Sequence, residues 1–150
     1  MVTVRIASWV ARLAGTLALL MGLFFWSVEL GWLNAPLVFN HTYINIHIAF
    51  GVLVTLALLV VSVALLLTRG ERILGAIGVV YALVVPIFGE LQLSLYVSGA
   101  PWLVPMIHLL IGVGAVGLAQ NSGRRYNRLK PATTQNTASG GRAEKAQVAR

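Results

Sequence analysis

Cysteine is absent from this chain of 150 residues. Its absence excludes disulfide bonds, metal sites built from thiolates and the covalent attachment of c-type haem. Charged side chains are also scarce, at 10% of the residues, whereas a soluble domain carries about 25%. Because 58% of the residues are hydrophobic, the composition indicates an integral membrane protein and leaves no room for a soluble catalytic domain.

Four apolar stretches are each long enough to cross the hydrocarbon core of a bilayer, which takes about 20 helical residues. They run at about 8–31, 42–68, 73–96 and 102–120. We therefore predict an all-α integral membrane protein, an antiparallel bundle of four transmembrane helices within a membrane domain at 1–121. The remainder, 122–150, is rich in small polar and basic residues. It cannot bury enough apolar surface to offset its chain entropy, so we predict a disordered basic tail.

The positive residues are confined to one side of the predicted topology. They lie at the start of the first span, between the second and third spans, and after the fourth: Arg5, Arg12, Arg69, Arg72, Arg124, Arg125, Arg128, Lys130, Arg142, Lys145 and Arg150. The positive-inside rule then predicts a multi-pass protein of the cell membrane with both termini in the cytoplasm. The partner of this basic surface is expected to be the lipid bilayer, and no nucleic acid is expected to bind.

Two histidines occupy the same five-residue frame, His47-Ile-Ala-Phe-Gly51 and His108-Leu-Leu-Ile-Gly112. Both lie about 8 Å below the predicted outer starts of two parallel spans. Residues i and i+4 share a helix face, so each imidazole has a glycine beside it. Because an ionisable side chain within an apolar span indicates function, we predict that His47 and His108 ligate the iron of a non-covalent b-type haem. Gly51 and Gly112 would leave room for the macrocycle.

Two other interpretations of these frames remain open. The histidines could be interfacial residues that hydrogen-bond to loop carbonyls, with Gly51 and Gly112 as close-packing positions between helices. They could also ligate zinc, which requires further ligands from Glu29, Glu90 or His41.

Three more polar residues lie near the predicted outer ends of the spans. His41 is expected in the loop before the second span, where it would either bond a haem propionate or be solvated. Glu29 and Glu90 are the acidic residues of the outer half. Desolvation there would suit them to carry protons, which is the catalytic role we assign to them. Otherwise their carboxylates would extend to the lipid headgroups.

Residues 89–110, GELQLSLYVSGAPWLVPMIHLL, resemble the third span, short loop and fourth span of one half of a haem A synthase. That family consists of two four-helix bundles related by pseudo-symmetry, with paired histidines on the second and fourth helices of each. The positions of His47 and His108 match this pattern. Only one bundle is present here, and the family's outer-loop cysteine pair is missing. The resemblance implies a haem-binding oxidoreductase, and a homodimer would rebuild the two-bundle form.

These observations together predict a membrane protein that binds one haem b near the outer face. It would act in electron transfer or haem modification, with a quinol or a respiratory-chain protein as its redox partner. The alternative is a small non-haem membrane subunit that packs against a respiratory or transport complex.

Overall fold

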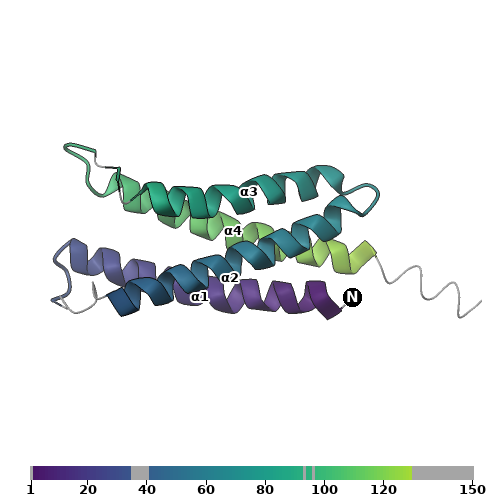
Figure 1. Cartoon of the computed structure of the whole chain (residues 1–150), viewed down its shortest axis with the longest axis horizontal. Coiled ribbons are helices and arrows are strands. Elements are labelled where there is room, and N and C mark those ends of the chain that lie inside the picture. The colour runs from purple at the N-terminus through teal and green to yellow at the C-terminus, as the bar shows by residue number, and fades with distance from the viewer. Residues whose placement is uncertain (1, 35–40, 93, 96, 130–150) are drawn as a thin grey trace, which may run out of the picture.

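The computed structural model describes residues 2–34, 41–92, 94–95 and 97–129, and in these ranges every regular element is a helix. Helix α1 spans Val2–Glu29, α2 His41–Leu66, α3 Arg72–Leu91 and α4 Leu103–Leu129 (Figure 1). All four are long enough and apolar enough to cross a membrane. The all-helical class and the four apolar helices expected from the sequence are therefore confirmed.

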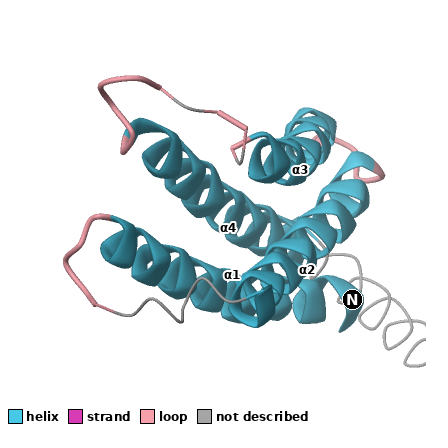
Figure 2. Ribbon diagram, turned by 60° about the vertical axis from the view of Figure 1, so that its left-hand side comes forward, coloured by secondary structure: helices cyan, strands magenta, loops and turns pink. Residues whose placement is uncertain are grey.

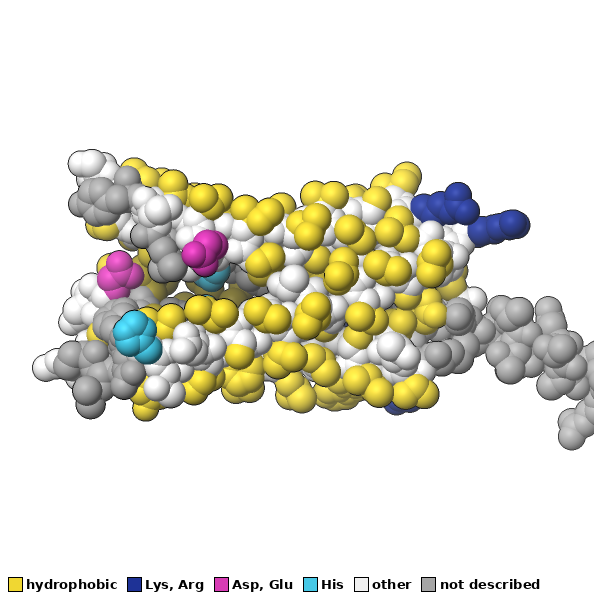
Figure 3. Space-filling model, viewed as in Figure 1, with side chains coloured by type: hydrophobic (Ala, Val, Ile, Leu, Met, Phe, Trp, Pro, Cys, Tyr) yellow, Lys and Arg dark blue, Asp and Glu magenta, His cyan; other side chains and the backbone are white. Residues whose placement is uncertain are grey.

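The two ends of the molecule differ in chemistry. The α1–α2 and α3–α4 connections lie at one end, which we call the histidine end (Figure 1). The N-terminus, the α2–α3 turn and the last turn of α4 lie at the other, the arginine end. Figure 3 shows histidine and acidic side chains at the first end and basic side chains, all of them arginines, at the second.

Two helices are longer than their apolar stretches. Helix α1 begins at Val2 instead of residue 8, because Val4, Ala7 and Ala11 continue its helical stripe of buried residues while Arg5 is exposed. Helix α4 continues to Leu129, so residues 122–129 are helical and the prediction that the disordered tail begins at 122 is wrong.

The extension of α4 is explained by packing that its composition does not show. Ser122, Gly123 and Tyr126 are buried, and Gly123 lies against the hydroxyl of Ser8 on α1. A glycine on this face lets the two backbones approach closely. The rest of the predicted tail, 130–150, lies outside the described residues.

Two boundaries at the histidine end also differ from the prediction. Helix α3 ends at Leu91 rather than at 96. The backbone N–H and the hydroxyl of Ser94 both donate to the Leu91 carbonyl, at 3.0 and 2.9 Å. The Leu95 N–H donates to the same carbonyl at 3.1 Å, so the chain leaves the helix in a tight turn. His41, expected in the loop, is the first residue of α2.

The buried core occupies only the half of the bundle nearer the arginine end. It is built largely from alanine and valine, which allow close helix packing, around the fully buried Leu58 and Leu65. In the histidine half, by contrast, Val104 is the one buried side chain among the described residues.

The helices separate where this packing stops. Figure 2 brings the histidine end forward and shows α3 and α4 standing apart from α1 and α2 there. The space-filling view in Figure 3 is hollowed at the same end, between the two pairs of helices. The bundle is therefore closed at the arginine end and open at the histidine end.

Candidate functional site

The structure brings His47 and His108 together in the open half of the bundle. His47 lies in the second turn of α2 and His108 in the second turn of α4. Their ring centroids are 6.2 Å apart, and the ring planes are inclined at 50°. Both side chains are partly buried. Two residues far apart in the chain thus form one site, which we call the histidine site.

The separation of the rings suits two ligands on opposite faces of one metal. An imidazole nitrogen lies about 2 Å from a bound metal ion such as zinc, and the ring centroid lies about 1 Å further, so two imidazoles that held one metal between them would have their centroids about 6 Å apart. The 6.2 Å between His47 and His108 agrees with this value. Rotation of a ring about the ligand axis leaves the spacing unchanged, so the 50° inclination is compatible with it.

Neither imidazole has a hydrogen bond at Nδ1. Both Nδ1 atoms are buried and without a partner. The backbone of Ala18 on α1 lies close to the His47 ring, but it does not bond Nδ1. These atoms are therefore not satisfied by loop carbonyls, as the interfacial interpretation requires. Buried polar atoms without hydrogen-bond partners are uncommon, and each needs an explanation, of which a bound ion or a redox role is one.

Two glycines face the imidazoles, and neither is a glycine predicted from the sequence. A Cβ atom at Gly22 of α1 would lie 3.4 Å from Cε1 of His47, and one at Gly89 of α3 would lie 3.7 Å from Cε1 of His108. Each histidine therefore packs over a glycine of the helix that precedes its own.

The predicted glycines Gly51 and Gly112 have a different environment. A Cβ at Gly51 would meet nothing within 4 Å, and one at Gly112 would make an ordinary 3.5 Å contact with Leu19. Gly51 is therefore not a close-packing position. The space beside it, one helical turn from His47, is open, as clearance for a flat group requires.

Phenylalanines complete the surroundings of both rings. Phe25 of α1 meets His47 edge to face, with centroids 5.6 Å apart and planes at 71°. Phe88 of α3 stacks on His108 at 6.2 Å and 19°. Each pair of helices thus supplies one glycine, one phenylalanine and one histidine. Sequence analysis missed both phenylalanines, because the i, i+4 rule relates residues within a helix and not across helices.

Two more buried polar atoms lie on helix faces that lead away from the site. Trp26 Nε1 and Thr55 Oγ1 are buried without hydrogen-bond partners. Trp26 follows Gly22 by one turn toward the histidine end, and Thr55 follows Gly51 by one turn toward the bundle centre. The indole N–H is a donor only, so Trp26 offers an unused donor on the side of the site nearer the histidine end.

The remaining predicted residues stay outside this arrangement. His41, Glu29 and Glu90 are all exposed on the bundle, and the proton-carrying role of the two glutamates stays a prediction. The described ranges also contain no cluster of three or more histidine or acidic residues that could hold a metal ion. The zinc interpretation needs such a cluster, and the donor set instead consists of two imidazoles.

No protein-family model, curated protein or solved structure matches this chain. The similarity of residues 89–110 to haem A synthases therefore remains an inference from those residues. The assignment of function depends on the geometry of the histidine site.

Proposed function

We propose that this chain is a membrane b-type haem protein that carries electrons, with His47 and His108 as the two axial ligands. The observation that carries the proposal is the pair of facing imidazoles, 6.2 Å apart, in the half of the bundle that has almost no buried side chains. The unpartnered Nδ1 atoms and the open space beside Gly51 support it.

Each residue of the site has a role in this proposal. His47 and His108 supply neutral imidazole nitrogens, and Phe25 and Phe88 keep water from the rings. The outer loops contain no Lys or Arg to pair with haem propionates, so the unused indole N–H of Trp26 is the donor that we assign to one of them. The bound haem supplies a one-electron redox couple.

Ligation by two histidines favours electron transfer over chemistry at the iron. If His47 and His108 both held the iron, they would leave no ligand position for a substrate or for oxygen. Haem modification, as the similarity to haem A synthases suggests, would require a second haem as substrate. A homodimer of this bundle would provide the second site, and conversion of haem O to haem A on expression would detect the activity.

The membrane arrangement belongs to the same proposal. The arginine end carries every Arg of the described residues, so we place it and both termini in the cytoplasm, in an antiparallel bundle that spans the cell membrane. The histidine site then lies near the outer face. A quinol or a respiratory-chain protein at that face is the redox partner that fits.

Absorption spectroscopy on the purified full chain tests the proposal. We expect a Soret band, and α and β bands on reduction, that are lost in His47→Ala and in His108→Ala. His41→Ala is the matched control, because it removes an imidazole from the exposed start of the same helix as His47, and it should keep the bands. Circular dichroism should show equal helix content in all four proteins.

Two outcomes would contradict the proposal. A colourless wild-type protein with full helix content, purified from haem-replete cells, would favour the non-haem membrane subunit. Retention of haem by the His47→Ala, His108→Ala double variant would place the haem elsewhere in the molecule.

A further inference from the structure

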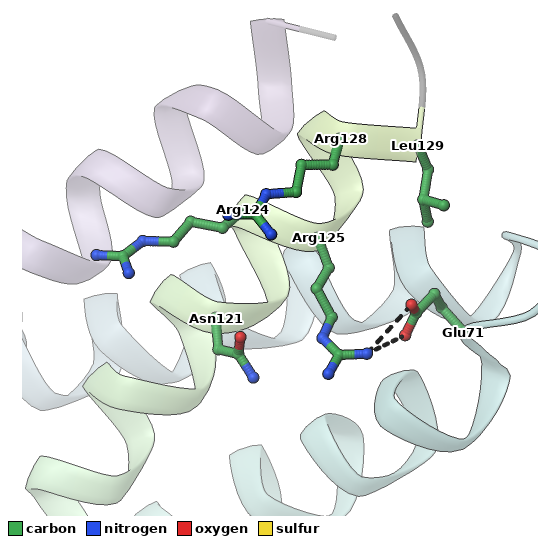
Figure 4. Close-up of a pocket in the computed structure, with 6 residues that line it drawn as sticks. All are labelled: Glu71, Asn121, Arg124, Arg125, Arg128 and Leu129. Atoms are coloured by element: carbon green, nitrogen blue, oxygen red, sulfur yellow. Dashed lines mark hydrogen bonds and ion pairs between the residues drawn. The ribbon is translucent and has the colours of Figure 1, made fainter. Parts of the chain in front are cut away.

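A second site lies at the opposite end of the molecule from the histidines. A pocket of about 400 Å³ opens there between the start of α3 and the last turns of α4. It is lined by Glu71, Asn121, Arg124, Arg125, Arg128 and Leu129 (Figure 4). We call it the arginine pocket. Three guanidinium groups and one carboxylate make it strongly positive.

The positive charge of this pocket is only partly neutralised. Arg125 Nη1 lies 3.3 Å from Oε1 and 3.4 Å from Oε2 of Glu71, and half of the arginine side chain is exposed, so the pair is weak. No ion pair within the described ranges involves Arg124 or Arg128, and Figure 4 shows both extending away from Glu71. Two guanidinium groups therefore remain available to an anion.

Phosphate is the anion that fits these groups. The planar guanidinium donates two parallel hydrogen bonds to phosphate oxygens. Arg124 and Arg128 are four residues apart on α4, so they share a face and are placed to contact one phosphate together.

The position of the pocket indicates that the phosphate belongs to a lipid. The apolar part of α4 ends just before Asn121, which puts the pocket at the level of the headgroups. Leu67 and Ile73, on either side of the turn that holds Glu71, have 83% and 80% of their surface exposed. They provide an apolar surface for acyl chains beside the charged pocket, which a free phosphate ion would not use.

We propose that the arginine pocket binds the phosphate of an anionic lipid headgroup. Arg124 and Arg128 contact the phosphate, and Glu71 limits the affinity by holding Arg125. Basic pockets between helices at the membrane surface recognise anionic headgroups in this way. The proposal does not depend on haem, because the histidine site lies at the other end of the bundle.

Lipid binding to the full chain in a neutral detergent tests this proposal. Native mass spectrometry would measure the retention of phosphatidylglycerol, with zwitterionic phosphatidylcholine as the comparison. We expect the wild type to retain phosphatidylglycerol in preference to phosphatidylcholine. The double variant Arg124→Gln, Arg128→Gln should bind phosphatidylglycerol roughly 25-fold more weakly, which is about fivefold for each arginine. The charge-matched control, Arg5→Gln, Arg69→Gln, changes exposed arginines at the same end that do not line the pocket. It should bind the lipid within about twofold of the wild type.

The variant Glu71→Gln tests the opposite change, a gain in lipid affinity. It keeps the shape of the side chain and frees Arg125, so phosphatidylglycerol should bind about fivefold more tightly. Equal weakening of phosphatidylglycerol binding in the pocket variant and the control variant would show that the lipid responds only to net charge. That result would refute the assignment of lipid binding to the arginine pocket. Displacement of the lipid by millimolar inorganic phosphate, but not by equal ionic strength of chloride, would identify a free-phosphate site and overturn the lipid assignment. Unchanged helix content by circular dichroism and an unchanged melting temperature would show that each variant is folded.

Discussion

Replacing Gly51 with leucine separates the stability of the bundle from its capacity to bind haem. A Cβ atom at Gly51 would meet nothing within 4 Å, so the fold accepts a Cβ atom there without a clash. The same space lies one turn from His47 on the same helix face. In our proposal a haem occupies it, and a leucine would exclude the haem. Gly51→Leu should therefore stabilise the haem-free protein and prevent haem from binding.

The stability gain follows from the helical position of Gly51. Glycine in a helix interior costs about 0.8 kcal/mol relative to leucine. In a chain of this length that difference raises the melting temperature by roughly 2–3 °C. Gly117 of α4 is the matched control, since it is also helical and a Cβ there would also meet nothing within 4 Å. Gly117→Leu should show the same gain in stability and bind haem normally.

The assay compares the wild type and both variants prepared with and without haem. Thermal unfolding of the haem-free proteins gives their melting temperatures without the stabilisation that a bound ligand adds. Haem titration followed at the Soret band gives their affinities for haem. Undiminished haem binding by Gly51→Leu would refute the placement of the macrocycle beside Gly51. A lower melting temperature for Gly51→Leu would show that the space is needed for packing.

Two further predictions follow from single side chains. Trp26→Phe keeps the aromatic surface and removes the buried Nε1 donor. Haem should then bind about tenfold more weakly, because a hydrogen bond to a charged group contributes about 1.5 kcal/mol. Equal haem affinity of the variant and the wild type in the titration would show that Trp26 does not bond a propionate. Leu58→Ala truncates a fully buried side chain in the arginine half and should cost about 2–5 kcal/mol of stability, measured by denaturant unfolding. The position of the Soret band should stay the same, and a shifted band would show that the two halves of the bundle are coupled.

The helices were predictable in number and approximate position, and their ends were not. The apolar runs predicted α2 closely, because His41–Leu66 is apolar over almost its whole length. They missed the first residues of α1 and the last turns of α4. Those segments contain arginines and small polar residues, and they are helical because one face of each packs on the other, as Gly123 does on Ser8. Hydropathy averaged along the chain does not show which face is buried.

The two halves of the histidine site differed in how readily they could be predicted. The matched frames of His47 and His108 were visible as a repeat within the chain. Gly22, Gly89, Phe25 and Phe88 were not, since nothing in their spacing relates them to a histidine on another helix. Their roles depend on the rotation of α1 and α3 about their own axes.

The amino-acid sequence by itself determined that four helices of membrane-spanning length form, because the length of an apolar run and the spacing of charges are local properties. It also marked the two histidines, because an ionisable residue is conspicuous within such a run. Only the tertiary structure decided that the imidazoles face each other and that the core closes around the arginine half alone. Those features come from side-chain packing between helices, where alanine allows close approach at one end and separation leaves an open site at the other.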